Sequence, residues 1–154
     1  MVKINWGRVV LGGVVCAVVF NVLWLAAWIL FLRSEWLSAV AALGRTFPEG
    51  LGSLAFWFVL TFGGGIFVIW LYAALAKAFE GTPAGKRILV AYGPGPRTAA
   101  GVGFIFWLIT GLGPTLWWAR ILSLPTGLVA TTLVVGLVAD VVATVVGAWP
   151  YKEE

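Results

Sequence analysis

The segment that decides the fold is residues 124–151, LPTGLVATTLVVGLVADVVATVVGAWPY. It is long and apolar enough to cross a lipid bilayer, and its only charged residue is Asp140. An ionised carboxylate is costly to bury in hydrocarbon, so we expect Asp140 to stay protonated, to pair with a neighbouring helix or to face water. Each outcome requires other helices around this segment, which therefore predicts a helical bundle.

The composition of the chain predicts a membrane protein. Hydrophobic residues make up 62% of the 154 residues, charged residues make up only 10%, and the mean hydropathy is +1.04. A soluble domain of this length has no room to bury so much apolar surface, so the excess must face lipid. Histidine is absent and Cys16 is the single cysteine, which removes the commonest metal ligand and any internal disulfide. We expect no metal, no cofactor and no enzymatic activity.

Three further uncharged runs precede this segment, at residues 9–32, 54–75 and 98–119. Each is close to the ~20 residues that a transmembrane helix needs. The chain is therefore predicted to be an all-α polytopic membrane protein, a four-transmembrane-helix bundle forming a single transmembrane domain over residues 1–154, with the last span at about 124–149. A cleaved secretory signal is the rival for the first run, but its apolar region would be only ~7–15 residues long. A β-barrel is excluded because barrel strands are short and alternate polar with apolar residues.

The loops carry signals of their own. The segment between the first two runs carries the charged residues Glu35, Arg45 and Glu49. Its apolar residues recur at roughly helical spacing: Trp36, Leu37, Val40 and Leu43. This pattern predicts a short interfacial helix in the first loop, ended by Gly44 and Pro48. Near the far end of the third run, Pro114 predicts an end or a kink in that helix.

Charge distribution predicts the orientation in the membrane. Four spans place both termini on one side, together with seven basic residues: Lys3, Arg8, Lys77, Lys86, Arg87, Arg97 and Lys152. The other side has three, Arg33, Arg45 and Arg120. This asymmetry favours an orientation with both termini in the cytoplasm. In the middle loop, Lys77, Lys86, Arg87 and Arg97 are expected to contact lipid headgroups or a protein partner, and no nucleic acid is expected to bind.

Small and polar residues recur at intervals of four on two of the predicted helices. They are Gly13, Ala17 and Asn21 on the first, and Gly136, Asp140 and Thr144 on the fourth. At about 1.5 Å per residue, Asn21 lies about 20 Å from Arg8 and Asp140 about 16 Å from Tyr151, so their depths match. We predict that the two stripes face each other and that Asn21 and Asp140 form an interhelical hydrogen bond. The triplet Gly63, Gly64 and Gly65 in the second run is predicted to be a further helix-packing site.

The tryptophans divide into two sets. Five lie at span ends, where an amphipathic ring is favoured: Trp6, Trp36, Trp117, Trp118 and Trp149. The other five lie inside or near the middle of spans and are interpreted as lipid-facing or packing residues: Trp24, Trp28, Trp57, Trp70 and Trp107.

Short motifs spread along the chain resemble a known group of proteins. They are KINWGRVVLGG at residues 3–13, Asn21, LYAAL at 71–75, GPGPRTA at 93–99 and the acid in the last helix. With these motifs the chain resembles small four-helix bacterial integral membrane proteins of unknown function, and the likeness covers most of its length. In that group the first helix often carries an acid soon after the asparagine, whereas here Val22, Leu23 and Trp24 follow. The resemblance implies a membrane bundle but no particular activity.

Two functions from different classes are compatible with this sequence. The first is a non-catalytic accessory or structural subunit of a larger bacterial inner-membrane complex, with membrane lipids and other subunits, or further copies of itself, as partners. The second is a small oligomeric proton-coupled transporter or channel that uses Asp140. An integral-membrane enzyme comes third, because no cluster of metal ligands or nucleophiles is evident in the sequence.

Overall fold

The long apolar runs form four long helical segments. The computed structural model describes residues 4–47, 50–78 and 95–151. Within these residues, four helices are long and apolar enough to cross a membrane, Trp6–Ala42, Leu51–Lys77, Pro96–Leu122 and Thr126–Ala148, and no strand occurs. The prediction of an all-α chain with four membrane-length helices is confirmed.

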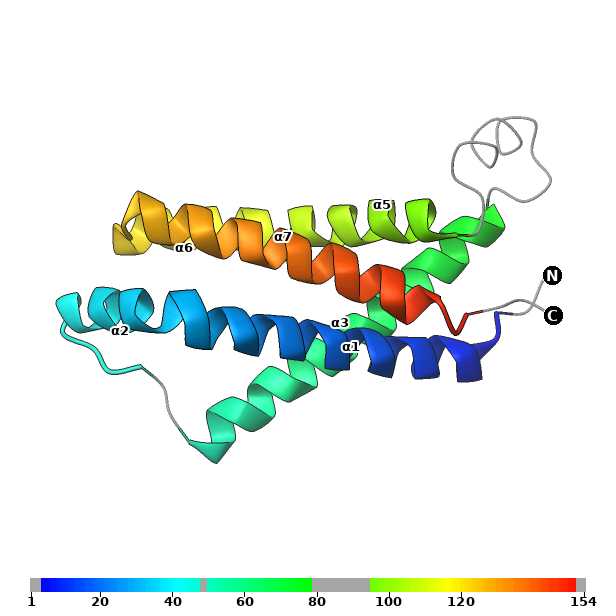
Figure 1. Cartoon of the computed structure of the whole chain (residues 1–154), viewed down its shortest axis with the longest axis horizontal. Helices are drawn as coiled ribbons and strands as arrows, with labels where there is room; N and C mark the ends of the chain where they lie inside the picture. Colours follow the sequence, from blue (N-terminus) through cyan, green and yellow to red (C-terminus); the bar gives the residue numbers. More distant parts are fainter. Residues whose placement is uncertain (1–3, 48–49, 79–94, 152–154) are drawn as a thin grey trace.

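The first long segment is one uninterrupted helix rather than two. It consists of α1 (Trp6–Ala27), a π-helical stretch η1 (Trp28–Leu32) and α2 (Arg33–Ala42). At about 1.5 Å per residue, its 37 residues extend about 55 Å, well beyond the ~30 Å of a hydrocarbon core. Figure 1 shows α2 continuing the line of α1.

The predicted separate interfacial helix is therefore corrected to a continuation of α1. No glycine or proline occurs between Trp28 and Ala42, so nothing in the sequence breaks the helix where the charges begin. The indole Nε1 of Trp36 donates a hydrogen bond to Thr132 Oγ1 of the last helix at 3.2 Å, which holds α2 against the bundle. The helix ends where predicted, because Gly44 adopts a left-handed φ of +67°. Its N–H and that of Arg45 bond back to the carbonyls of Ala41 and Val40, a Schellman ending.

The remaining helices complete the bundle. They are α3 (Leu51–Ala78), then α5 (Pro96–Trp107), η2 (Leu108–Leu112) and α6 (Gly113–Leu122) in one continuous run, and finally α7 (Thr126–Ala148). The run does not end at Pro114. The π-helical segment η2 ends two residues before this proline, which has no N–H to donate to the Thr110 carbonyl one turn back. Ser123, with a φ of +50°, then turns the chain into α7.

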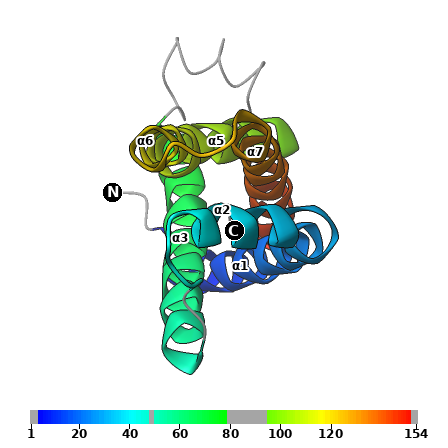
Figure 2. The ribbon, with the colours of Figure 1, turned by 90° about the vertical axis from the view of Figure 1, so that its left-hand side faces the viewer.

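The helices pack in two layers crossed by α3. Helix α1 packs mainly against α3 and α7, while α5 packs mainly against α7. Figure 2 shows the α5, α6 and α7 layer above α1 and α2, with α3 passing across both. The two chain termini lie at the same end of the bundle (Figure 1).

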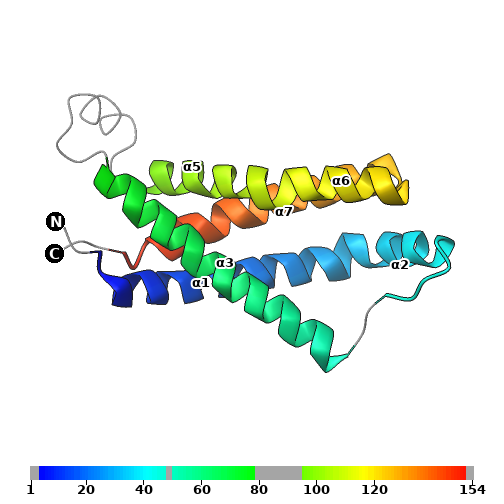
Figure 3. The same cartoon turned by 180° about the vertical axis from the view of Figure 1, so that it is seen from behind.

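Helix α3 lies obliquely, and its C-terminal half is buried more deeply than its N-terminal half. Its C-terminal half is buried in the main core through Val68, Ile69, Tyr72 and Ala73. Its N-terminal half leans away from the other helices, as Figure 3 shows from behind, and its apolar side chains there are exposed. A second, smaller core lies near η1, where Leu32 and Leu128 are each no more than 1% exposed.

Candidate functional site

The polar side chain of Asn21 joins α1 to α3. Its Nδ2 donates to the Ala17 carbonyl one turn back at 2.8 Å and to Thr61 Oγ1 at 2.9 Å. Its Oδ1 accepts from Trp57 Nε1 at 2.8 Å. Trp57 and Thr61 are one turn apart on α3, so both reach the same amide. The amide thus has a partner for each donor and for its oxygen, and it fastens the two helices together.

Aromatic rings pack beside the hydrogen bonds of Asn21. The rings of Phe20 and Trp24 stack with centroids 5.9 Å apart, and both lie beside Trp57, at 6.3 and 5.9 Å respectively. Such ring pairs contribute about 0.5–1.5 kcal/mol beyond the area they bury. The apolar rings also keep competing hydrogen-bond partners away from the amide.

The predicted hydrogen bond between Asn21 and Asp140 is not formed. Asn21 uses its amide on α3, and within the part of the chain that the structure describes no hydrogen bond reaches the Asp140 carboxyl. The predicted match in depth did not decide the pairing, because the rotation of α1 about its own axis turns Asn21 toward α3. On α1 the face with Gly13, Ala17 and Asn21 meets α3, whereas the adjacent face, with Gly12 and Cys16, meets α7.

The α1–α3 crossing is a contact between backbones. A Cβ added at Gly13 would lie 2.5 Å from Ile66 Cα, and one added at Gly65 would lie 2.5 Å from the Gly13 carbonyl oxygen and 3.1 Å from Ala17 N. Of the predicted glycine triplet, Gly65 lies at this crossing and Gly64 faces the ring of Phe106. Gly63 has no neighbouring atom within 4 Å of an added Cβ.

The α7 stripe contacts both α5 and α1, since a Cβ added at Gly136 would lie 3.4 Å from Trp107 of α5 and 3.8 Å from Trp24 of α1. A Cβ added at Gly103 of α5 would lie 2.9 Å from both the Asp140 carbonyl oxygen and Thr144 Oγ1. Thr144 is 1% exposed, and its hydroxyl donates to that same carbonyl at 2.7 Å. Helix α7 meets α1 through Gly147, which lies against Cys16 and the Gly12 carbonyl. The sequence signal for this contact was the spacing of four between Gly12 and Cys16.

A second polar centre lies between α5 and α7. Trp107 is 8% exposed, and its Nε1 is buried without a hydrogen-bond acceptor among the described residues. Its indole fits against Gly111 on its own helix and against Gly136 on α7, where an added Cβ would lie 3.4 Å from Nε1. Asp140 follows Gly136 by one helical turn and is half-buried. A free donor and an unbonded carboxyl therefore lie about one turn apart in the bundle.

Buried polar atoms without partners are rare and point to a functional or binding role. The interpretation of Trp107 as a plain packing residue missed this centre. Gly111 and Gly136 are the sequence signal for this centre, because the flat ring of Trp107 packs where two residues have no side chain.

The basic residues of the middle loop are only partly described. Lys77 lies in the last turn of α3, and Arg97 is exposed in the first turn of α5. Both helix ends lie at the end of the bundle that holds the termini (Figure 1). Lys86 and Arg87 lie outside the described residues. Across residues 4–47, 50–78 and 95–151, no group of three His, Cys, Asp or Glu side chains is placed to hold a metal ion.

Comparison with known proteins gives no relative. No protein family, no curated protein and no solved structure matches the chain.

Proposed function

We propose that this protein is a non-catalytic structural subunit of a larger complex in a bacterial inner membrane. The supporting observation is the outer face of α3, the helix whose N-terminal half leans out of the bundle (Figure 3). On this face Phe56 is 66% exposed and Val59 is 71% exposed, and Gly63 has open space above it. These three residues, which we call the α3 outer face, follow one another at helical spacing.

A free glycine among large apolar side chains suits another transmembrane helix. Association of helices in lipid depends on close packing, and small residues let two backbones approach each other. Five glycines of this chain, at positions 12, 13, 65, 103 and 147, already serve such crossings inside the bundle. Gly63 offers the same opportunity on the outside. The partner is therefore a membrane-spanning helix that lies along the α3 outer face.

The proposed orientation follows the positive-inside rule. The termini, the end of α3 and the start of α5 lie at one end of the bundle (Figure 1), and seven of the ten basic residues belong to the corresponding segments of the sequence. That end is proposed to be cytoplasmic.

Partner capture tests this function. The tagged chain is purified from its native membranes in a mild detergent, with a photo-crosslinking amino acid at Val59, and with one at Val134 of α7, also exposed, as the control. We expect an adduct with a second membrane protein from position 59 and not from position 134. We further expect Gly63→Leu to reduce the co-purified partner about tenfold, equivalent to about 1.4 kcal/mol.

The matched control for this substitution is Gly101→Leu, because an added Cβ at Gly101 also meets nothing within 4 Å. Equal partner recovery in both leucine variants, or a chain that purifies without any partner, contradicts the proposed function.

A second candidate function is favoured by the centre between α5 and α7. The Asp140 carboxyl and the Trp107 Nε1 both lack hydrogen-bond partners in the described part of the chain. An unbonded carboxyl inside a membrane bundle is free to take up and release a proton. A small oligomeric proton-coupled transporter or channel would use it in this way.

Asp140→Asn separates the two candidates. A transporter is expected to lose its proton flux in this variant, measured with a pH-sensitive dye inside proteoliposomes that carry the purified chain. The unfolding midpoint of the variant is expected to stay near that of the wild type, because no hydrogen bond to the carboxyl is lost. Unchanged flux in Asp140→Asn, or no flux in the wild type, eliminates the transporter.

A further inference from the structure

Two adjoining hollows lie along α2, at the end of the bundle opposite the termini. The first has a volume of about 260 Å³ and is lined by Ile29, Leu30, Phe31, Arg33, Ser34 and Leu37. The second has a volume of about 530 Å³ and is lined by Leu37, Ala41, Arg45, Thr46 and Phe47. Because Leu37 lines both, we treat them as one groove, the α2 groove. Each half of the groove contains one arginine, one hydroxyl group and several apolar side chains.

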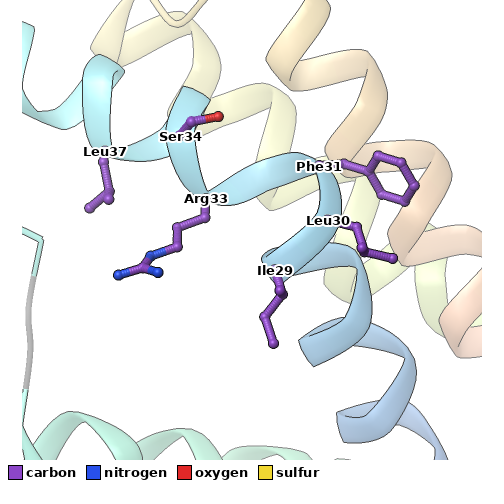
Figure 4. A pocket seen from close by; sticks show the side chains of 6 residues that line it. All are labelled: Ile29, Leu30, Phe31, Arg33, Ser34 and Leu37. Carbon is purple, nitrogen blue, oxygen red and sulfur yellow. The ribbon is translucent and has the colours of Figure 1, made fainter.

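The groove follows one face of the helix. Ile29, Arg33 and Leu37 are spaced four apart, and Figure 4 shows their side chains extending to the same side. The acidic residue nearest to Arg33 on this helix is Glu35, which is rotated by about 200° from it and so lies on another face. The ring of Phe47 lies 5.1 Å from that of Trp28, so the chain after α2 folds back over the groove.

The two guanidinium groups have no acceptor within residues 4–47, 50–78 and 95–151. Arg33 and Arg45 are exposed, and neither forms a hydrogen bond or ion pair with the residues that the structure describes. A guanidinium carries five N–H donors in a fixed fork that matches the oxygens of a phosphate group. The groove thus contains two arginines without a partner among the described residues, next to several apolar side chains.

The depth of Arg33 places this groove at a headgroup layer. Arg33 follows Arg8 by 25 positions in the same continuous helix, which is about 37 Å at 1.5 Å per residue. The hydrocarbon core measures about 30 Å, so both arginines lie just outside it when the helix spans the membrane. Lipid phosphates occupy this depth, and Ile29 and Leu30, which precede Arg33 in the helix, extend the apolar surface of the groove toward the core.

We propose that the α2 groove binds one anionic phospholipid, with its phosphate held by Arg33 and an acyl chain lying against Ile29 and Leu30. Arg45 follows the end of α2, about 13 Å beyond Arg33, and adds positive charge on the headgroup side. This site is independent of the α3 outer face and of the basic middle loop. A phosphodiester with an attached acyl chain satisfies both the charged and the apolar parts of the groove, which a free ion does not.

Native mass spectrometry of the delipidated full-length chain in detergent tests the site. The probes are phosphatidylglycerol, phosphatidylcholine and inorganic phosphate, titrated separately. We expect one phosphatidylglycerol to bind more tightly than phosphatidylcholine, and no binding of inorganic phosphate in the same range. Arg33→Gln is expected to weaken phosphatidylglycerol binding about fivefold, the effect of removing one basic residue near an anionic lipid, and Arg45→Gln is expected to weaken it less.

Arg120→Gln is the matched control, because Arg120 is exposed at the last turn of α6 and lines neither hollow. It is expected to leave binding unchanged. Arg33→Lys is expected to retain part of the affinity for phosphatidylglycerol, since the positive charge remains but the planar guanidinium that binds a phosphate through two N–H groups is lost. Three results overturn the proposal: equal loss in Arg120→Gln, no preference for phosphatidylglycerol over phosphatidylcholine, or displacement of the lipid by inorganic phosphate.

Discussion

Gly65→Ala is expected to destabilise the bundle by about 1–3 kcal/mol, the cost of forcing an extra carbon into a well-packed core. The added Cβ would lie 2.5 Å from the Gly13 carbonyl oxygen and 3.1 Å from the backbone nitrogen of Ala17. These are backbone atoms of α1, and no side-chain rotation moves them. Relief requires α1 and α3 to separate, which also stretches the Asn21 hydrogen bonds one turn beyond the crossing.

Gly63, the first glycine of the same triplet, provides the control. Gly63→Ala introduces the same methyl group in the same helix, but it meets nothing within 4 Å. It is expected to be neutral or to stabilise the helix by up to about 1 kcal/mol, because alanine favours a helix more than glycine does. Unfolding of the purified chain in mixed micelles, followed by circular dichroism, measures both variants. If the two behave alike, the described crossing at Gly65 is wrong.

The number and approximate extent of the helices could be predicted from the sequence because the physics involved is local. A long uncharged run such as 54–75 must satisfy its backbone polar groups internally in lipid, and a helix is the way to do so. The end of the first helix at Gly44 was also readable, since glycine readily adopts the left-handed conformation that ends a helix.

The partners of each helix were not predictable in the same way. The predicted stripe of Gly13, Ala17 and Asn21 is real, but it faces α3, because one step along a helix turns a side chain by about 100°. Depth along the axis can be counted from a sequence, whereas rotation depends on the whole set of contacts. The pairing of Asn21 with Asp140 was inferred from the two stripes and from their matching depth, and it is wrong because neither fixes which neighbouring helix a stripe faces.

Two further features depended on long-range packing. Charges at Arg33 and Glu35 predicted a change from a spanning helix to a surface helix, yet the backbone continues because no residue there interrupts it. The buried Nε1 of Trp107 depends on Gly136, which lies on a different helix and far along the chain. Neither the continuity of α2 nor this unsatisfied donor is visible in the hydropathy pattern.

Asn21→Leu is expected to cost about 2–4 kcal/mol of stability. It removes two hydrogen bonds to α3, each worth about 0.6 kcal/mol on average between membrane helices. It also leaves Trp57 Nε1 without an acceptor in a ring-lined environment, and an unsatisfied buried donor costs about 1–3 kcal/mol. Thr61 is affected less, because its hydroxyl keeps a bond to the Phe58 carbonyl at 3.2 Å.

A double-mutant cycle shows whether this cost arises from the hydrogen bond between Asn21 and Trp57. Trp57→Phe removes the indole donor while keeping an aromatic ring, so in its presence Asn21→Leu is expected to cost about 1 kcal/mol less. The cycle is measured by the same micelle unfolding, with Asp140→Asn as the comparison at a polar side chain that has no hydrogen bond to lose. Additive effects of the two α1–α3 substitutions would show that Asn21 and Trp57 do not interact. A larger cost for Asp140→Asn than for Asn21→Leu would make the carboxyl on α7, and not the amide on α1, the polar group that holds the helices together.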